Sequence, residues 1–163
     1  MDTATPAPAT TYLKLRQRLL SLSPTELGIS ASKAAPRVWG VLVEMGYEAG
    51  TATLTAYADG TTSLHFSTGG GLLGRGDYLP LAETAKALVA QAEADMENMS
   101  RSTEFPLPEV GKVNFIVLTY AGIFAGAAPE KKLSVNTHPL AALYHCTQDA
   151  MSQLRMLAEK RRK

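Results

Sequence analysis

The stretch Arg37–Ser67, RVWGVLVEMGYEAGTATLTAYADGTTSLHFS, decides the fold because apolar residues recur in it at every second position. Such alternation places one set of side chains on one face of an extended strand and the other set on the opposite face. Turn sequences at Glu48–Gly50 and Asp59–Gly60 divide the stretch into three runs. The pattern therefore predicts three antiparallel strands joined by two hairpins.

The loop between the second and third strands fixes their register. A two-residue Asp59–Gly60 loop would place Leu54 opposite His65 and split the apolar face. A three-residue Ala58–Gly60 loop, with its glycine in the left-handed conformation, places Leu54 opposite Leu64 instead. We expect the second arrangement because it collects the apolar side chains on one face.

The other face of these strands is polar. It carries Thr53, Thr55, Tyr57, Ser63, His65 and Ser67. Antiparallel sheets commonly leave one face in water, so the first interpretation is a solvent-facing surface. A surface for a protein partner or a ligand is the alternative.

The rest of the sequence predicts three helices and two more strands. Helical spacing of apolar residues occurs in Thr11–Leu22, in Tyr78–Met99 and from Pro139 to Leu157. Val113–Tyr120 is apolar at both odd and even positions, as in a covered central strand, and Ile123–Ala127 is a weaker strand. The expected order is α-β-β-β-α-β-β-α, an α+β fold with a five-stranded antiparallel sheet flanked by helices.

Length and composition fit one domain. With 163 residues, of which 45% are hydrophobic, the chain can bury a core, so we expect a disordered segment at residues 1–9 and a single α+β domain at residues 10–163. A formal net charge of +1 gives no field that would hold nucleic acid or an anionic membrane. A single cysteine, Cys146, and a start unlike a signal peptide predict a cytoplasmic protein.

A glycine-rich stretch, Ser67–Gly76, follows the third predicted strand and precedes the second helix. Within it, Gly69–Gly74 satisfies G-x-G-x-x-G, and amides at a helix N-terminus can hold phosphate. Residues 75–79 nevertheless separate this pattern from the helix, and the strand before it belongs to a hairpin, unlike a dinucleotide-binding unit. A packed or flexible crossover and a phosphate or nucleotide site both stay open.

The ligand hypothesis for residues 68–76 has a defined set of binding residues. They are Gly69, Gly70, Gly71, Gly74, Arg75, Ser67 and His65. Leu72 and Leu73 would be costly to expose at a loop tip, so we expect them to dock on the core or on a second subunit.

The sequence predicts no catalytic residue, no metal site and no cofactor. His145 and Asp149 can meet on one helical face, but Cys146 points about 100° away from His145 and lies mid-helix, without help from the helix dipole. His65, His138 and His145 lack the spacing of metal ligands. The basic end, 160–163, complements a helix C-terminus, so nucleic acid is not an expected partner.

The order of elements resembles the roadblock and profilin-like architecture. In addition, Ser67–Gly71, Val117–Gly122 and His138–Leu140 resemble segments of a family of functionally uncharacterised bacterial proteins of this size. The resemblance covers most of residues 37–157 and implies the fold without a catalytic assignment.

Two functions are compatible with these features. The first is a non-enzymatic protein-interaction or regulatory module that forms a homodimer through the alanine-rich second helix, a strand edge or Leu72 and Leu73. The second is a binding protein or enzyme for a small phosphate compound or nucleotide, which uses the glycine-rich loop.

Overall fold

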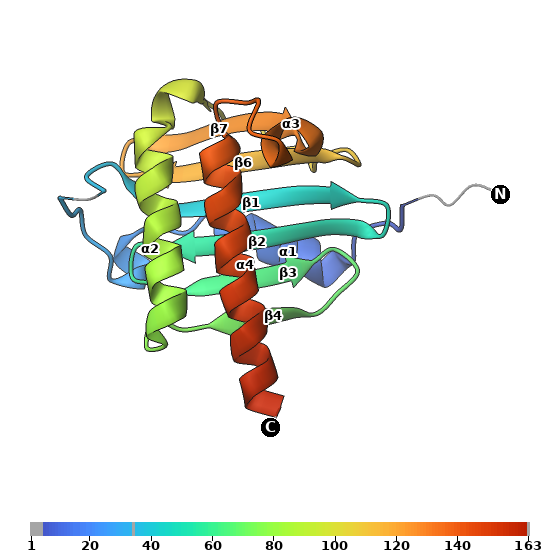
Figure 1. Ribbon diagram of the computed structural model, residues 1–163, viewed down its shortest axis with the longest axis horizontal. Helices are drawn as coiled ribbons and strands as arrows, with labels where there is room; N and C mark the ends of the chain where they lie inside the picture. Colours follow the sequence, from blue (N-terminus) through green and yellow to red (C-terminus); the bar gives the residue numbers. More distant parts are fainter. Residues whose placement is uncertain (1–4, 34, 163) are drawn as a thin grey trace.

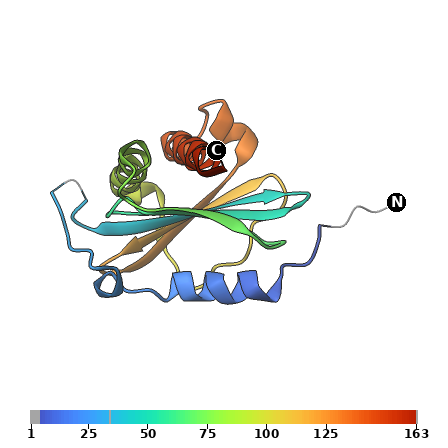
Figure 2. The same cartoon turned by 90° about the horizontal axis from the view of Figure 1, so that it is seen from below.

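The computed structural model describes residues 5–33 and 35–162, and it contains one antiparallel sheet with helices on both faces (Figures 1 and 2). The strands are β1 (Val38–Tyr47), β2 (Gly50–Tyr57), β3 (Thr62–Phe66), β4 (Gly71–Gly74), β5 (Ser100–Arg101), β6 (Lys112–Thr119) and β7 (Gly122–Pro129). The helices are α1 (Thr10–Leu20), α2 (Leu79–Ala94), α3 (Glu130–Ser134) and α4 (Ala141–Arg162), with 3₁₀ turns at Thr25–Leu27 and Met96–Asn98. The predictions for residues 1–4 and for Lys163 lie outside the described residues.

The α+β class is confirmed, but the predicted five-stranded sheet is wrong. The sheet has seven strands in the order β4-β3-β2-β1-β6-β7-β5. The first missed strand, β4, lies within the glycine-rich segment and pairs with β3 so that Leu72 lies opposite Leu64. The second, β5, is two residues long and pairs with β7. Both strands are too short, and β4 too rich in glycine, for a period of two to stand out.

The predicted register of β2 and β3 is confirmed. Leu54 lies opposite Leu64 and Ala52 lies opposite Phe66. Gly60 has a φ of 92°, a backbone conformation that residues with a side chain rarely adopt. The three-residue loop therefore places the apolar side chains of both strands on the same face.

The main core lies between this apolar face and the two long helices, α2 and α4, which lie side by side over it (Figures 1 and 2). Fully buried Leu54, Leu64 and Phe115 from the sheet meet Leu88 of α2 and Leu143 of α4. Three alanines of α2, Ala82, Ala85 and Ala92, are buried here as well. This face of α2 is thus used within the chain.

The polar face of the sheet is covered, so its interpretation as a solvent-facing surface is wrong. Helix α1 lies along it on the side opposite α2 and α4 (Figure 2). Thr53 and Thr55 are at most 1% exposed, and a second apolar cluster that includes Leu19, Trp39 and Tyr57 closes one end. Local sequence could not show this, because the covering helix is distant along the chain.

A buried ion pair holds α1 on the sheet. Arg16 donates to both carboxylate oxygens of Glu44, from Nε at 2.8 Å and from Nη2 at 2.7 Å, and also to the carbonyl oxygen of Phe105. Thr53 Oγ1 donates to Glu44 at 2.8 Å, and the hydroxyl of Tyr12 lies 2.6 Å from Thr53 Oγ1. Burial raises the pKa of Tyr12 to about 12. With Glu44 completely buried, every charge in the cluster has a partner.

Candidate functional site

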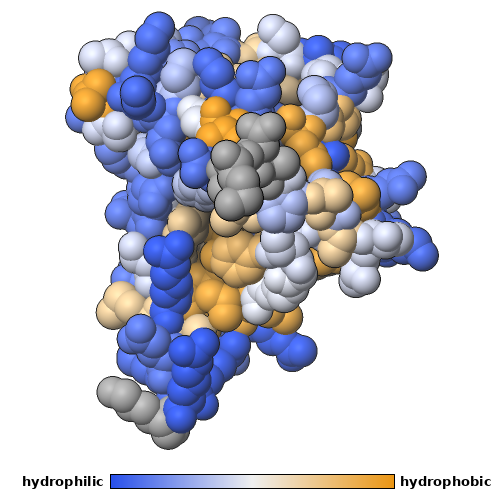
Figure 3. All heavy atoms as spheres, turned by 90° about the vertical axis from the view of Figure 1, so that its right-hand side faces the viewer, coloured by the Kyte–Doolittle hydropathy of each residue, from blue (hydrophilic) through white to orange (hydrophobic). Residues whose placement is uncertain are grey.

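A pocket opens on the side of the molecule where the β1–β2 turn and the end of β3 face α4. It has a volume of about 240 Å³. Three segments far apart in sequence form it: 47–52, 64–68, and one turn of α4 with Met151 and Arg155. Figure 3 shows this side of the molecule, where apolar surface gathers in the middle with polar surface around it. The pocket therefore exists only in the folded chain.

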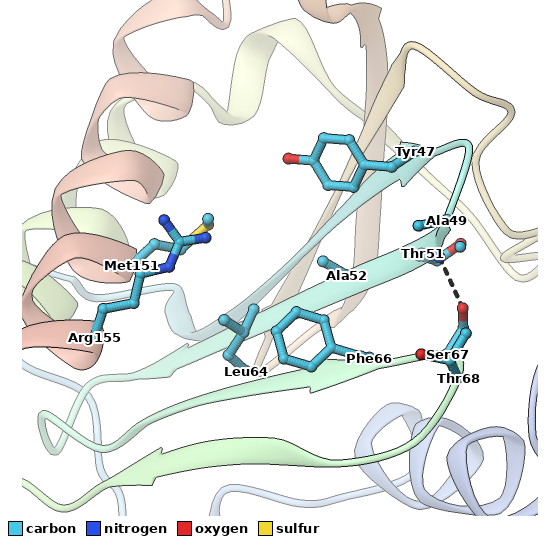
Figure 4. Close-up of a pocket in the computed structure, with 11 residues that line it drawn as sticks. Tyr47, Ala49, Thr51, Ala52, Leu64, Phe66, Ser67, Thr68, Met151 and Arg155 are labelled. Carbon is cyan, nitrogen blue, oxygen red and sulfur yellow. Dashed lines mark hydrogen bonds between the residues drawn. The ribbon is translucent and has the colours of Figure 1, made fainter. Parts of the chain in front are cut away.

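The walls of the pocket are largely apolar. Leu64 and Ala52 are buried at its base, and Phe66 beside them is 37% exposed. Met151 contributes its thioether from α4, and Tyr47 lies across from Arg155 with its hydroxyl toward the gap (Figure 4). An aromatic ring and a thioether at an open surface make a concave apolar area of the kind that small ligands fill.

One rim of the pocket is fixed by the hydroxyl of Ser67. The Thr51 amide donates to Ser67 Oγ at 2.8 Å, and the Ser67 amide donates to the Thr51 carbonyl at the same distance (Figure 4). Gly50 has a φ of 131°, and a Cβ there would stand 2.5 Å from Ser67 Oγ. A glycine is therefore required at Gly50 for these two hydrogen bonds to form.

The opposite rim of the pocket carries a positive charge, the guanidinium of Arg155. Arg155 is exposed and makes no ion pair or hydrogen bond with any residue in the described part of the chain. Its guanidinium extends beside Met151 toward the gap that Phe66 and Tyr47 face (Figure 4). Burial raises the pKa of the Tyr47 hydroxyl, and the nearby carboxylate of Glu130 raises it further, while Arg155 opposes the shift. At neutral pH the rim thus presents a neutral phenol and one cation.

The residues predicted for a phosphate site do not surround one cavity. Ser67 lines the pocket, whereas Gly69 and Gly70 lie in the exposed β3–β4 turn and Gly71 and Gly74 belong to β4. Arg75 follows the far end of that strand, about 13 Å along it from the turn. His65 faces the other side of the sheet, and burial lowers its pKa. The phosphate or nucleotide hypothesis at these amides stays a prediction.

Leu72 and Leu73 point to opposite faces of the sheet from edge strand β4. Leu72 packs against the main core, as one of the two expected alternatives required. Leu73 points to the other face and is 51% exposed, and its carbonyl oxygen accepts a hydrogen bond from Arg161. Only Leu73 is therefore available to a second subunit.

Two further groups contain residue types found in catalytic sites, but their surroundings do not suit catalysis. His65 Nε2 lies 2.8 Å from Ser63 Oγ, a pairing that the sequence did not suggest, but Ser63 is buried and its hydroxyl also shares a short hydrogen bond with Thr55. In α4, His145 pairs with Asn136. Burial, and then Asp149 and Asp95, raise the pKa of the Cys146 thiol, which is the opposite of what a thiolate nucleophile needs.

Other kinds of site find no support in the described residues. No group of three or more His, Cys, Asp or Glu side chains among them could hold a metal ion. No helix in residues 5–33 and 35–162 combines the length and apolar character needed to cross a bilayer. The pocket beside α4 brings three segments together around open space, with one charged side chain at its rim.

The pocket residues missed by sequence analysis are Tyr47, Phe66, Met151 and Arg155. One signal was present: Arg155 follows Met151 by four residues, so the helical period places it beside the apolar stripe. Nothing in the sequence places that turn of α4 opposite the tips of β1 and β3.

Comparisons of the chain with protein-family models, with curated proteins and with solved structures find no match.

Proposed function

We propose that this chain is a non-enzymatic binding module that takes up a small molecule in the pocket between α4, the β1–β2 turn and the end of β3. The observation that carries the proposal is the combination of apolar walls with one unpaired cation at the rim. Such a site orients a ligand through few polar contacts and holds it by burial. The pocket lining has no histidine, cysteine or carboxylate, so binding is a better description than catalysis. The single cysteine favours a cytoplasmic setting.

The test is to fill the pocket. Ala49 is exposed in the β1–β2 turn and lines the mouth, so Ala49→Trp should occupy the space and leave the core intact. A panel of small aromatic and aliphatic compounds is screened against the wild type by thermal shift, and hits are followed by NMR. We expect hits to perturb signals of residues 47–52, 64–68 and 151–155, and the Ala49→Trp variant to lose at least about tenfold in affinity, equivalent to 1.4 kcal/mol.

Ala121→Trp is the matched control, because Ala121 is also an exposed alanine in a hairpin turn but does not line the pocket. It should bind hits like the wild type. Compounds whose affinity is unchanged by Ala49→Trp, or a panel without any hit, would contradict the proposal.

Self-association is a second candidate, favoured by the exposure of Leu73 on edge strand β4. Three of the six alanines of α2, Ala82, Ala85 and Ala92, are buried within the chain, so a strand edge is a better surface for association than α2. We expect light scattering at micromolar concentration to give twice the mass of one chain, and Leu73→Lys to give a monomer. Leu79→Lys, at a leucine that is 70% exposed on α2, should leave the dimer intact. A wild-type monomer would refute this candidate.

A further inference from the structure

We infer that the ligand of the pocket is a small monocarboxylate with an aromatic or short aliphatic body, whose carboxylate meets Arg155 while its body lies against Phe66 and Met151. This inference rests on the proposed binding function and names the chemical class of the ligand. It comes from three features of the pocket: its unpaired cation, its apolar walls and its volume.

The cation calls for an anionic group. The three ion pairs among the described residues use Arg16, Arg18 and Arg37, and none involves Arg155. Glu130, whose carboxylate raises the pKa of Tyr47, accepts a hydrogen bond from the hydroxyl of Tyr144 at 3.1 Å and forms no ion pair with Arg155. A guanidinium has a planar fork of donors that matches both oxygens of a carboxylate, so a carboxylate satisfies it in one plane.

The walls and the volume limit the rest of the ligand. A volume of about 240 Å³ lies just below the range of about 300–1,000 Å³ typical of pockets for drug-sized ligands, which suits a smaller molecule of about ten non-hydrogen atoms. Phe66, Met151 and Leu64 form an apolar surface that an aromatic ring or a short alkyl chain can cover. Arg155 is the one charged residue among those that line the pocket. A second negative charge on the ligand would therefore be buried without a partner.

The experiment compares phenylacetate with its neutral isostere phenylacetamide, using NMR titration of the full chain at low ionic strength. We expect the wild type to bind the acid about tenfold more tightly than the amide, because a charge-assisted hydrogen bond is the stronger one. Arg155→Gln should abolish this preference and leave the affinity for the amide within twofold of the wild type. Arg155→Lys, which keeps the charge but loses the fork, should retain part of the preference.

Arg162→Gln is the matched control, since it removes one exposed positive charge from the same helix and Arg162 does not line the pocket. It should keep the full preference for the acid. Equal binding of acid and amide by the wild type, or a preference that survives Arg155→Gln, would overturn the inference while leaving a binding pocket in place. If the wild type binds neither compound, the inference is overturned as well. If hits bind the Ala49→Trp variant as tightly as the wild type, the proposed function itself is contradicted.

Discussion

Replacing Arg16 with methionine is expected to lower the free energy of unfolding by about 3–5 kcal/mol, because it leaves the completely buried carboxyl group of Glu44 without its cation. Methionine keeps much of the length of the arginine side chain and fills similar space, so packing changes little. The loss falls on the carboxylate, which then keeps only neutral hydrogen-bond partners such as Thr53. Urea unfolding followed by tryptophan fluorescence measures the effect through Trp39, which is buried beside α1.

Arg18→Met provides the matched control. Arg18 pairs with Glu26 at 2.6 Å, but both side chains are largely exposed, at 59% and 41%. An exposed pair of this kind contributes about 0–1 kcal/mol. The double variant Arg16→Met with Glu44→Leu should recover most of the stability, because it removes the unpaired charge. Equal effects of the two single substitutions would show that the buried pair is not what fixes α1.

Replacing Gly46 with alanine is expected to lower the free energy of unfolding by about 3 kcal/mol through a steric clash. A Cβ at Gly46 would stand 2.1 Å from the carbonyl oxygen of Glu109 and 3.0 Å from that of Pro108. The obstacle is backbone, so no side chain can rotate away. The Gly46 carbonyl also accepts a hydrogen bond from the Gly111 amide at 2.9 Å, and the clash would pull this connection away from β1.

Gly111→Ala separates the clash from the conformational preference of glycine. Gly111 has a φ of 82°, but a Cβ there would meet nothing within 4 Å. Its substitution should cost only the left-handed backbone strain, about 1–2 kcal/mol. Both variants are measured by urea unfolding, with unchanged dependence on denaturant as evidence of an unchanged fold. A Gly46→Ala variant as stable as the wild type would contradict the close approach of the 108–111 segment to β1.

Sequence predicted best where local chemistry decides the structure. The register of β2 and β3 followed from alternation and from the need for a left-handed Gly60, both of which depend on neighbouring residues. The edge strand β4 was missed because four residues with a glycine at each end carry no readable period. Burial of the polar sheet face was missed because Arg16 and Glu44 belong to separate elements, and only the docking of α1 pairs them.

The candidate site was less predictable for the same reason. Ser67 was found through its neighbouring glycines, while the walls and the cation come from a hairpin tip and a turn of α4 that meet only in the folded chain. A pattern in sequence can mark an unusual residue, but the space between three distant segments has no local signature. The pocket lies beside the glycine-rich turn, and Ser67 and Thr68 belong to both.

The central position of the β1–β6 pair has a consequence for synthesis of the chain. Val38–Met45 of β1 pairs with Val113–Thr119 of β6, while the hairpins of β1 to β4 and all of α2 lie between them in the sequence. As a growing chain leaves the ribosome, the four N-terminal strands can pair with one another first, but the inner edge of β1 must wait for β6. Until then, β1 keeps an open edge beside its apolar residues Val41, Val43 and Met45, and nascent chains at this stage are exposed to aggregation.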